Sequence, residues 1–529
     1  MNPFKKLASQ TAIYGLPTII GRLLNYFLVP LYTYNFAPSE YGTVNEMYAY
    51  VSFLLIVLTY GMETALFNFS RLHDNPEGAG KQKVYSTILT CVTITSGVFI
   101  AGLTIFSQPI ADLIRYPNHP EYITWFALIL GLDAVSAIAF AKLREQNKAK
   151  NFAVIKTLNI GVNIAFNLFF IAFCPKILHH PDSAFYSFVQ KIYSPEVGIG
   201  YIFISNLIAS AVTLLVQLPS ILKGFSPLSL LLSRSSIAKR GGIPPSPEER
   251  AGVRRGEASM LKPILLYALP LLIAGLAGMT NETIDRILLK YLLPSNIALS
   301  QVGIYGACYK ISIIMTMFWQ TFRYAAEPFF FSHAKEHNAN KTFAHVMNYF
   351  VIICMLIFLG TMVNLSWIKY FVGKAYWEGL GVVPVLLLAN FCIGVFFNLS
   401  IWYKLSGKTR YGAYLTMFGA VITLIGNFIF IPLYGYMASA WATLACYAAM
   451  MVASYFIGNK HYPVNYDLKR FAGYVTLSLI LYALSGIISH ESHLVDLAMK
   501  NSLLLVFVIV VFIFERKNLS LNRNESQNS

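Results

Sequence analysis

The sequence predicts an all-α, polytopic membrane protein with fourteen transmembrane helices, and three observations support this prediction. Of 529 residues, 56% are hydrophobic and only 12% are charged, whereas a soluble globular domain carries about 25% charged residues. The mean hydropathy is +0.57. The apolar residues also form long unbroken runs instead of the alternation typical of a membrane β-barrel. Together these features exclude a soluble enzyme, a disordered chain and a fibrous protein.

Each predicted span is a mostly apolar run of about 20 residues or more, bounded by polar or charged residues. The first run follows Lys5 and Lys6, as in a signal peptide, but Arg22 interrupts it and no small-residue cleavage site follows. We therefore predict an uncleaved first helix. In chain order, the predicted helices are 10–36, 44–69, 85–110, 121–141, 152–173, 198–218, 263–285, 302–331, 346–366, 379–403, 411–432, 437–457, 471–489 and 497–514.

The distribution of basic residues predicts the orientation in the membrane. With the N-terminus in the cytoplasm, the two tails and six cytoplasmic loops hold 28 of the 40 Lys and Arg residues, and the seven outer loops hold 8. This asymmetry follows the positive-inside rule, so we expect both termini in the cytoplasm. The net charge of +16 then reflects topology, and we expect no nucleic-acid partner.

The longest polar stretch divides the first twelve predicted helices into two sixes. Residues 219–262 combine Pro, Gly and mixed charge, which is typical of a flexible linker. The four residues that end at Pro17 are echoed by those that end at Pro270, which favours two parallel repeats. The predicted organisation is an N-terminal lobe 1–218, a cytoplasmic linker 219–262, a C-terminal lobe 263–460, a peripheral helix pair 461–514 without a polar stripe, and a cytoplasmic tail 515–529.

Two charged residues lie deep enough in predicted spans to suggest a function. Arg22 and Asp133 are each about 18 Å from the membrane face at a rise of about 1.5 Å per residue. A charge at that depth costs roughly 2.5–3.5 kcal/mol and needs a polar cavity or a partner. Arg22 shares a helix face with Asn25, so we predict that this face lines a cavity. A mutual ion pair between Arg22 and Asp133 is the alternative.

Further polar residues follow single faces of other predicted helices. For the asparagines, hydrogen bonding between helices is the alternative to a binding role. Glu282 and Arg286, spaced i and i+4, could be a simple pair. With the two deep charges, the predicted site is Arg22, Asn25, Asn163, Asn281 and Lys310 as substrate contacts, Asp133, Glu63 and Asp285 as ion-coupling or cavity carboxylates, and Arg323 with Glu327 as a structural ion pair.

No motif for a cofactor, a metal or catalysis stands out. The chain has no GxxxxGK nucleotide-binding loop, so active transport would use an ion gradient or a partner. The run His333 to His337 fits H-x-x-E-H but has no third ligand nearby, and the six cysteines are scattered without a CxxC. The outer loops are short, which argues against a membrane enzyme. We expect no cofactor, no metal and no enzymatic activity.

Several motifs resemble the Wzx-type polysaccharide flippases of the multidrug/oligosaccharidyl-lipid/polysaccharide exporter superfamily. They lie in the stretches 21–42, 61–65 and 281–286. The resemblance implies two six-helix lobes around a central cavity plus a helix pair. It also implies export of undecaprenyl-diphosphate-linked oligosaccharide, as for O-antigen or capsule, by alternating access. By position, Arg22 matches the arginine of helix 1 in that family, whereas the 219–262 linker is longer than the family's loops.

The chemistry of the predicted cavity agrees with this resemblance. A desolvated arginine binds a diphosphate through two hydrogen bonds, and hydroxyls, amides and aromatic rings suit a sugar chain. We expect a monomer in the bilayer, with a proton or sodium counter-ion. Two alternatives remain: a multidrug cation antiporter of the same superfamily, whose cavity would be richer in carboxylates, and a membrane glycosyltransferase or polymerase, which would depend on outer-loop carboxylates.

Overall fold

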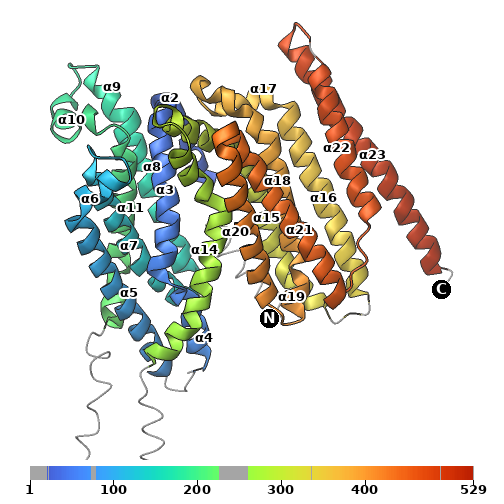
Figure 1. Ribbon diagram of the computed structural model, residues 1–529, viewed down its shortest axis with the longest axis horizontal. Helices are drawn as coiled ribbons and strands as arrows, with labels where there is room; N and C mark the ends of the chain where they lie inside the picture. The colour runs from blue at the N-terminus through green and yellow to red at the C-terminus, as the bar shows by residue number, and fades with distance from the viewer. Residues whose placement is uncertain are drawn as a thin grey trace, which may run out of the picture. The chain divides into compact units, whose positions relative to one another are not determined.

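The computed structural model describes residue 21 and residues 23–72, 79–225, 260–334, 336, 338–488 and 490–527. Over these residues the chain is almost entirely helical and has no strand (Figure 1). Thirteen helices in this part are long and apolar enough to cross a membrane, which confirms a multi-pass membrane protein. They match every predicted span from 44–69 onward. Residues 10–20 of the first predicted span lie outside the described residues, so the count of fourteen stays a prediction.

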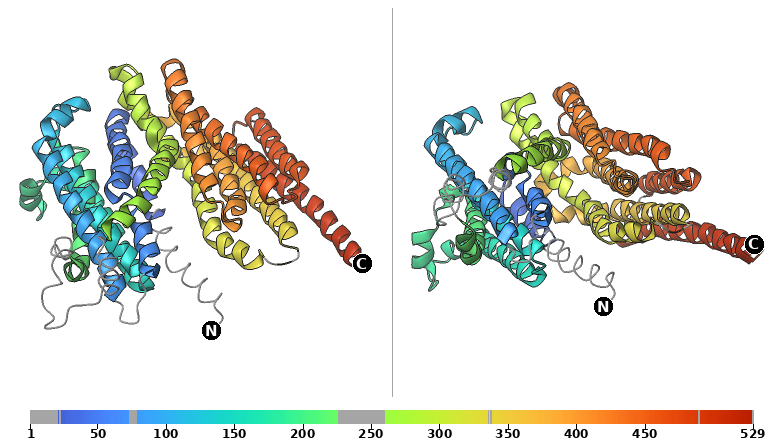
Figure 2. Two further views of the ribbon diagram at one scale, coloured as in Figure 1. Left: turned by 60° about the horizontal axis from the view of Figure 1, so that its bottom comes forward. Right: turned by 90° about the horizontal axis from the view of Figure 1, so that it is seen from below.

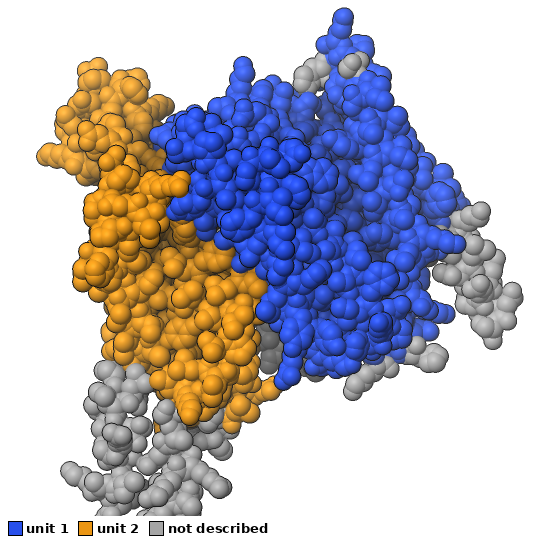
Figure 3. All heavy atoms as spheres, in the orientation of Figure 1, with its two compact units in different colours: residues 1–11, 32–46, 280–529 blue, residues 12–31, 47–279 orange. Residues whose placement is uncertain are grey.

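The chain divides into two compact units, coloured separately in Figure 3. Unit 1 comprises residues 1–11, 32–46 and 280–529, and unit 2 comprises residues 12–31 and 47–279. Three helices contribute residues to both units: α2 (Leu28–Asn35), α3 (Pro38–Thr59) and α14 (Leu261–Leu292). The predicted lobe boundary at 219–262 stays a prediction, because most of the linker lies outside the described residues.

Unit 2 is a helical bundle whose larger apolar core lies between α4, α5 and α7. Leu66 on α4, Tyr85, Ile88 and Leu89 on α5, and Ile138 on α7 are at most 2% exposed and pack together. Besides its parts of the shared helices, the unit contains α4 (Met62–Leu72), α5 (Ala79–Ile105), α6 (Ser107–Leu113), α7 (Pro120–Glu145), α8 (Ala149–Leu168), the π-helix Phe169–Phe173, α9 (Cys174–Leu178), α10 (Tyr186–Ile192), the 3-10 turn Pro195–Val197 and α11 (Gly200–Gly224).

A break interrupts the predicted helix 44–69. α3 ends at Thr59, and Tyr60 and Gly61 adopt positive φ angles of 31° and 75° before α4 begins. A glycine adopts this left-handed conformation without the steric penalty of a side chain. The span therefore continues as a second helix, α4, which carries Glu63 in its first turn.

Unit 1 contains the longer helices of the chain. α18 packs against α15 and α21, and α21 packs against α20. The two C-terminal helices, α22 and α23, pack against α16 and each other (Figure 2). Besides its parts of the shared helices, the unit contains α15 (Ser295–His333), α16 (Ala339–Val363), α17 (Leu365–Ile368), the 3-10 turns Lys369–Phe371 and Lys374–Gly381, α18 (Val382–Leu399), α19 (Ile401–Leu405), α20 (Arg410–Tyr434), α21 (Tyr436–His461), α22 (Leu468–Ile487) and α23 (His493–Gln527).

Two glycines bring α3 and α15 into backbone contact within unit 1. A Cβ atom on Gly42 would lie 1.8 Å from the carbonyl oxygen of Leu299, and one on Gly303 would lie 1.9 Å from that of Pro38. Small residues allow such close crossings of membrane helices. The first turns of α3 are therefore fixed against α15.

Candidate functional site

The described part of unit 1 holds a buried group of charged and aromatic side chains on α14 and α15. Arg286 and Asp285 are 8% and 4% exposed, and their Nη1 and Oδ1 atoms lie 3.0 Å apart. The hydroxyl of Tyr305 donates to Oδ2 of Asp285 at 2.6 Å. The guanidinium lies 4.6 Å from the ring centre of Tyr309. Because both charged residues lie within the helix Leu261–Leu292, which is long and apolar enough to span a membrane, the arrangement stabilises two charges that the bilayer would otherwise exclude.

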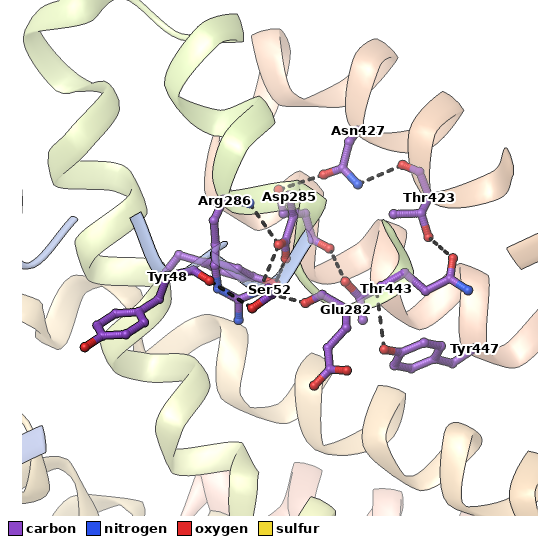
Figure 4. Close-up of polar contacts among 12 residues, drawn as sticks. Tyr48, Ser52, Glu282, Asp285, Arg286, Thr423, Asn427, Thr443 and Tyr447 are labelled. Carbon is purple, nitrogen blue, oxygen red and sulfur yellow. Dashed lines mark hydrogen bonds and ion pairs between the residues drawn. The ribbon is translucent and has the colours of Figure 1, made fainter. Parts of the chain in front are cut away.

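Two more charged residues adjoin this group: Lys310, which belongs to the predicted site, and Glu282, which does not. Lys310, next to Tyr309 on α15, is half-buried and interacts electrostatically with Arg286 and Glu282. The carboxylate of Glu282 is not the partner of Arg286, which instead donates from Nη1 to the backbone oxygen of Glu282 at 2.7 Å. Glu282 is exposed, and in Figure 4 its carboxylate points away from Asp285. Asp285 therefore neutralises Arg286 and leaves Lys310 without an ion pair in the described part of the chain.

Asn281 lies one turn before this group and connects three helices. Its side-chain amide donates to the backbone oxygen of Thr416 at 3.0 Å, and its carbonyl accepts from Thr423 on α20 at 3.3 Å. Tyr447 on α21 donates to the backbone oxygen of Asn281 at 3.3 Å. Asn281 thus uses its side chain to join α14 to α20, which is the structural alternative for such residues.

A second buried ion pair in unit 1 was not part of the predicted site. The Nζ of Lys290 lies 2.9 Å from Oε2 of Glu46, and their side chains are 4% and 0% exposed. The pair joins α14 to the early part of α3. The predicted span ends at residue 285, which puts Lys290 in a loop, whereas α14 continues to Leu292. The one sequence feature that could have indicated this ion pair is Glu46, an acidic residue within an apolar run.

In unit 2, Asp133 lies on α7 close to side chains of two neighbouring helices. Its carboxylate is partly buried and interacts with Ser210 on α11 and, electrostatically, with Lys156 on α8. Lys156 also lies 5.5 Å above the ring of Phe140. Asp133 makes no salt bridge within 4.0 Å to any described residue. Its predicted rival partner, Arg22, lies outside the described residues.

Two other predicted residues of unit 2 have structural partners. Glu63 forms an ion pair with Arg144, with an Oε2–Nη2 distance of 2.5 Å and side chains 38% and 35% exposed. Asn163 accepts a hydrogen bond at 2.9 Å from Asn167, one turn further on α8. These contacts join α4 to α7 and stabilise α8. The remaining predicted contact, Asn25, is exposed.

The predicted pair of Arg323 and Glu327 is replaced by other contacts. Glu327 pairs with Lys404 on α19, with an Oε1–Nζ distance of 2.5 Å. The guanidinium of Arg323 instead faces the rings of Phe397 and Trp319 at 5.1 and 5.9 Å. The i, i+4 spacing on one helix would allow Arg323 and Glu327 to pair. In the structure the carboxylate of Glu327 pairs instead with Lys404, which is distant in sequence.

Nothing in the described part of the chain indicates a metal centre. No group of three or more His, Cys, Asp or Glu side chains occurs there that could hold a metal ion. The six cysteines are free. His337 of the H-x-x-E-H run lies outside the described residues, so that motif has no described geometry.

Comparison with known proteins finds one family match and several solved structures with a similar fold. Residues 36–176 match the family model described as "Polysaccharide biosynthesis protein". No curated protein matches the sequence. The fold is similar to "Lipid II flippase MurJ, inward closed conformation", with a TM-score of 0.68, 14% identity, and coverage of 96% of this chain and 99% of that one.

Two multidrug transporters have a similar fold. One, an inward-facing MATE family transporter of the MOP superfamily, has a TM-score of 0.57 and 14% identity over 85% of this chain and 97% of that one. The other, the MATE multidrug transporter DinF-BH, has a TM-score of 0.57 and 17% identity over 86% and 96%. These matches confirm the predicted resemblance at the level of fold. The chain therefore has the fold of these flippase and transporter structures.

Proposed function

We propose that this protein is a flippase that moves an undecaprenyl-diphosphate-linked oligosaccharide across the bacterial cytoplasmic membrane, for the synthesis of a surface polysaccharide. One observation carries the proposal. The chain has the fold of a lipid II flippase over 96% of its length, and its residues 36–176 match a polysaccharide biosynthesis family. Alternating access of the two halves is the mechanism that such a fold supports.

The cations of the site suit a substrate with a diphosphate headgroup. Lys310 is half-buried beside Arg286, and Arg22 is predicted at mid-membrane depth. A basic side chain in a low-dielectric cavity binds a phosphate oxygen strongly, because little water competes for the charge. Tyr309 and Tyr447 add aromatic faces and hydroxyls near the same place, which suits a sugar chain. We propose Lys310 and Arg22 as the headgroup contacts.

Asp133 is the carboxylate that best suits ion coupling. Glu63 is paired with Arg144, and Asp285 is paired with Arg286, so both already have a cationic partner. Asp133 lies within a membrane span and has no salt bridge to a described residue. A carboxylate in such a place takes up a proton or a sodium ion more readily than a paired one. We propose that cation binding at Asp133 couples transport to an ion gradient.

Multidrug transport is the second candidate, because two structures with this fold are multidrug transporters. A pump for organic cations needs carboxylates that are free to meet its substrate. Around α14 and α15 the charges of Glu282 and Asp285 balance those of Arg286 and Lys310, so these charges alone favour neither substrate. The match of residues 36–176 to a polysaccharide biosynthesis family favours the lipid-linked oligosaccharide.

The test is complementation of a bacterial strain that lacks its own oligosaccharide flippase but makes the lipid-linked precursor. The wild-type chain should restore surface polysaccharide and remove the precursor that accumulates on the inner leaflet. Lys310→Ala should reduce export at least about tenfold, because about 1.4 kcal/mol of lost headgroup binding changes the rate by that factor. Lys310→Arg should retain most of it.

The matched control is Lys408→Ala, which removes the same charge from an exposed position of unit 1. It should export as well as the wild type. Membrane expression of every variant is measured in the same cells. If the wild-type chain is inserted at normal levels and the precursor still accumulates with every sugar repeat offered, the proposed substrate class is wrong.

A further inference from the structure

An apolar cavity lies in unit 1 between the helices α16, α18, α21 and α22. Its volume is about 220 Å³, and an engineered apolar cavity of roughly 150 Å³ is already large enough to bind benzene. The cavity is separate from the buried charges of α14 and α15, because no residue of those two helices lines it. Most of its wall is apolar, with Met347, Val395, Leu399, Met451 and Phe471 among the lining residues.

The cavity is closed on one side and open on the other. Met347 and Leu399 on the closed side are 3% and 5% exposed. Val452, Phe456 and Leu468 on the open side are 47%, 63% and 51% exposed. The helix α22 packs mainly against α16 and α23 (Figure 1), which leaves room beside the exposed residues of α21. The cavity is therefore accessible from the medium around unit 1, through an opening between α21 and α22.

The medium at the depth of this cavity is lipid. All four helices around it belong to candidate membrane spans. Met451 and Phe456 precede His461, the last residue of α21, by ten and five positions, which places them about 15 and 8 Å from the helix end at about 1.5 Å per residue. Because the hydrocarbon core of a bilayer is about 30 Å thick, the cavity lies within one leaflet. The distribution of basic residues predicts that this is the cytoplasmic leaflet.

The chemistry of the wall favours a hydrocarbon chain over water. A buried water molecule needs about two to four polar partners. The one carboxylate of the wall, Asp467, is already paired with Arg470, whose Nε lies 2.8 Å from its Oδ2 and which also lies 3.8 Å from Glu515. An unfilled apolar cavity leaves the atoms of its wall without contacts on one side, and a chain of methylene groups supplies those contacts.

Exposed basic residues flank the opening. Lys460 lies one helical turn beyond Phe456 on α21, and Lys469 follows Leu468 on α22. Both lysines are exposed, and neither forms an ion pair with a residue that the structure describes. Their two positive charges outweigh the one negative charge left by Arg470 and its two carboxylates. Basic residues between helices at the cytoplasmic surface attract the headgroups of anionic lipids.

We propose that this cavity holds an acyl chain of an anionic phospholipid from the cytoplasmic leaflet, with the headgroup at Lys460 and Lys469. The bound lipid fills the space between α21 and α22 and so joins the pair α22 and α23 to the rest of unit 1. A phospholipid suits the site better than the tail of a transported lipid for two reasons. The cavity is apart from the buried charges of α14 and α15, and its lysines lie at the surface where phospholipid headgroups lie. The site does not depend on the identity of the transported substrate.

The test titrates phosphatidylglycerol onto the full chain, delipidated in a neutral detergent, and counts bound lipids by native mass spectrometry. Val452→Trp fills the cavity with a larger side chain. It should weaken the tightest phosphatidylglycerol site at least about tenfold, which corresponds to about 1.4 kcal/mol of binding free energy. Its matched control is Val421→Trp on α20, at a residue that is 54% exposed and does not line the cavity. The control should bind as the wild type does.

The double variant Lys460→Ala/Lys469→Ala tests the headgroup contacts. It should weaken binding of phosphatidylglycerol at least about tenfold, and binding of phosphatidylcholine, whose headgroup has no net charge, by less than about twofold. The matched control Lys408→Ala/Arg410→Ala removes two exposed basic residues from the same predicted end of unit 1 and should bind as the wild type does. Size-exclusion profiles report folding. Because both lysines are exposed, this variant decides the question alone if Val452→Trp gives no monodisperse protein.

Equal affinity of the wild type, Val452→Trp and the double lysine variant for phosphatidylglycerol would overturn the proposal. Two other results would also overturn it by assigning the cavity to another occupant. Undecaprenyl phosphate that displaces phosphatidylglycerol at equal concentration would assign the cavity to the tail of a transported lipid. A wild-type dimer that Val452→Trp dissociates would assign it to a second copy of the chain. The proposed function is tested separately by export, so either proposal can fail without the other.

Discussion

The buried ion pair between Lys290 and Glu46 is the contact whose removal has the clearest expected cost. The two side chains are 4% and 0% exposed, and Nζ lies 2.9 Å from Oε2. At an effective dielectric constant of about 20, two unit charges at this distance attract by about 6 kcal/mol. Much of this attraction offsets the cost of removing both charges from water. Removing one partner is therefore expected to cost about 3–5 kcal/mol, because the other charge remains buried and uncompensated.

Lys290→Met and Glu46→Leu are the single variants, and the double variant replaces both charges by apolar side chains of similar volume. The free energy of unfolding is measured by denaturant titration in mixed micelles. Each single variant should lose about 3–5 kcal/mol, and the double variant should recover most of that loss. The control is Glu121→Gln. Glu121 is 40% exposed and its partner His119 is 44% exposed, so removal of this surface pair should cost less than about 1 kcal/mol.

The double variant decides between two accounts of this contact. If the pair matters as a pair, the two losses are strongly non-additive. If both single losses add in the double variant, Lys290 and Glu46 contribute through separate packing contacts, and the reasoning from charge compensation is refuted.

Three further predictions concern topology, packing and the C-terminal helices. Cysteines placed at Ser235 and Asn518 should react only with a membrane-permeant reagent in intact cells, and labelling by an impermeant one would contradict the cytoplasmic assignment. Gly42→Val should destabilise the protein or prevent its insertion, because its Cβ would lie 1.8 Å from a backbone oxygen. The control Gly97→Ala should be tolerated, because nothing lies within 4 Å of its new Cβ. Equal melting temperatures of the two variants would contradict this prediction. Asn501→Leu removes a reciprocal pair of side-chain hydrogen bonds to Asn364, at 3.1 and 3.0 Å, and should cost about 1–2 kcal/mol without changing substrate selectivity; a changed selectivity would show that α23 takes part in binding.

The spans were predictable because a bilayer demands length and apolarity, and both can be counted in the sequence. Every predicted span from 44–69 onward is matched by a helix long enough to cross a membrane. The turn at Tyr60 and Gly61 was not predicted, since a glycine within an apolar run has several uses and only the backbone shows which one applies. The ends of helices were also less predictable, because a charged residue can lie either in a loop or in the last turns of a helix. α14 continues to Leu292, so Lys290 lies in a helix and not in a loop.

The partners of charged residues were the least predictable feature of the candidate site. The i, i+4 spacing predicted a possible pair between Glu282 and Arg286. In the structure the guanidinium of Arg286 contacts the adjacent Asp285 and the ring of Tyr309 instead. The same spacing predicted a pair between Arg323 and Glu327, but Lys404 on α19 forms the ion pair with Glu327. An ion pair between helices depends on their packing, and a single sequence has no local signal for it. Residue types and depth were therefore predictable, while the choice of partner required the fold.

The measurement that tests the central claim most directly is transport by the purified protein in proteoliposomes with two cargoes side by side. One cargo is a fluorescent undecaprenyl-diphosphate-linked oligosaccharide, whose arrival in the opposite leaflet is detected by an impermeant quencher, and the other is a cationic dye. An ion gradient is imposed in both cases, and Asp133→Asn is the comparison for coupling. The account predicts movement of the lipid-linked oligosaccharide at a rate that falls with Asp133→Asn, and no movement of the dye. Dye transport without any movement of the lipid-linked oligosaccharide would contradict it and would make the chain a multidrug antiporter.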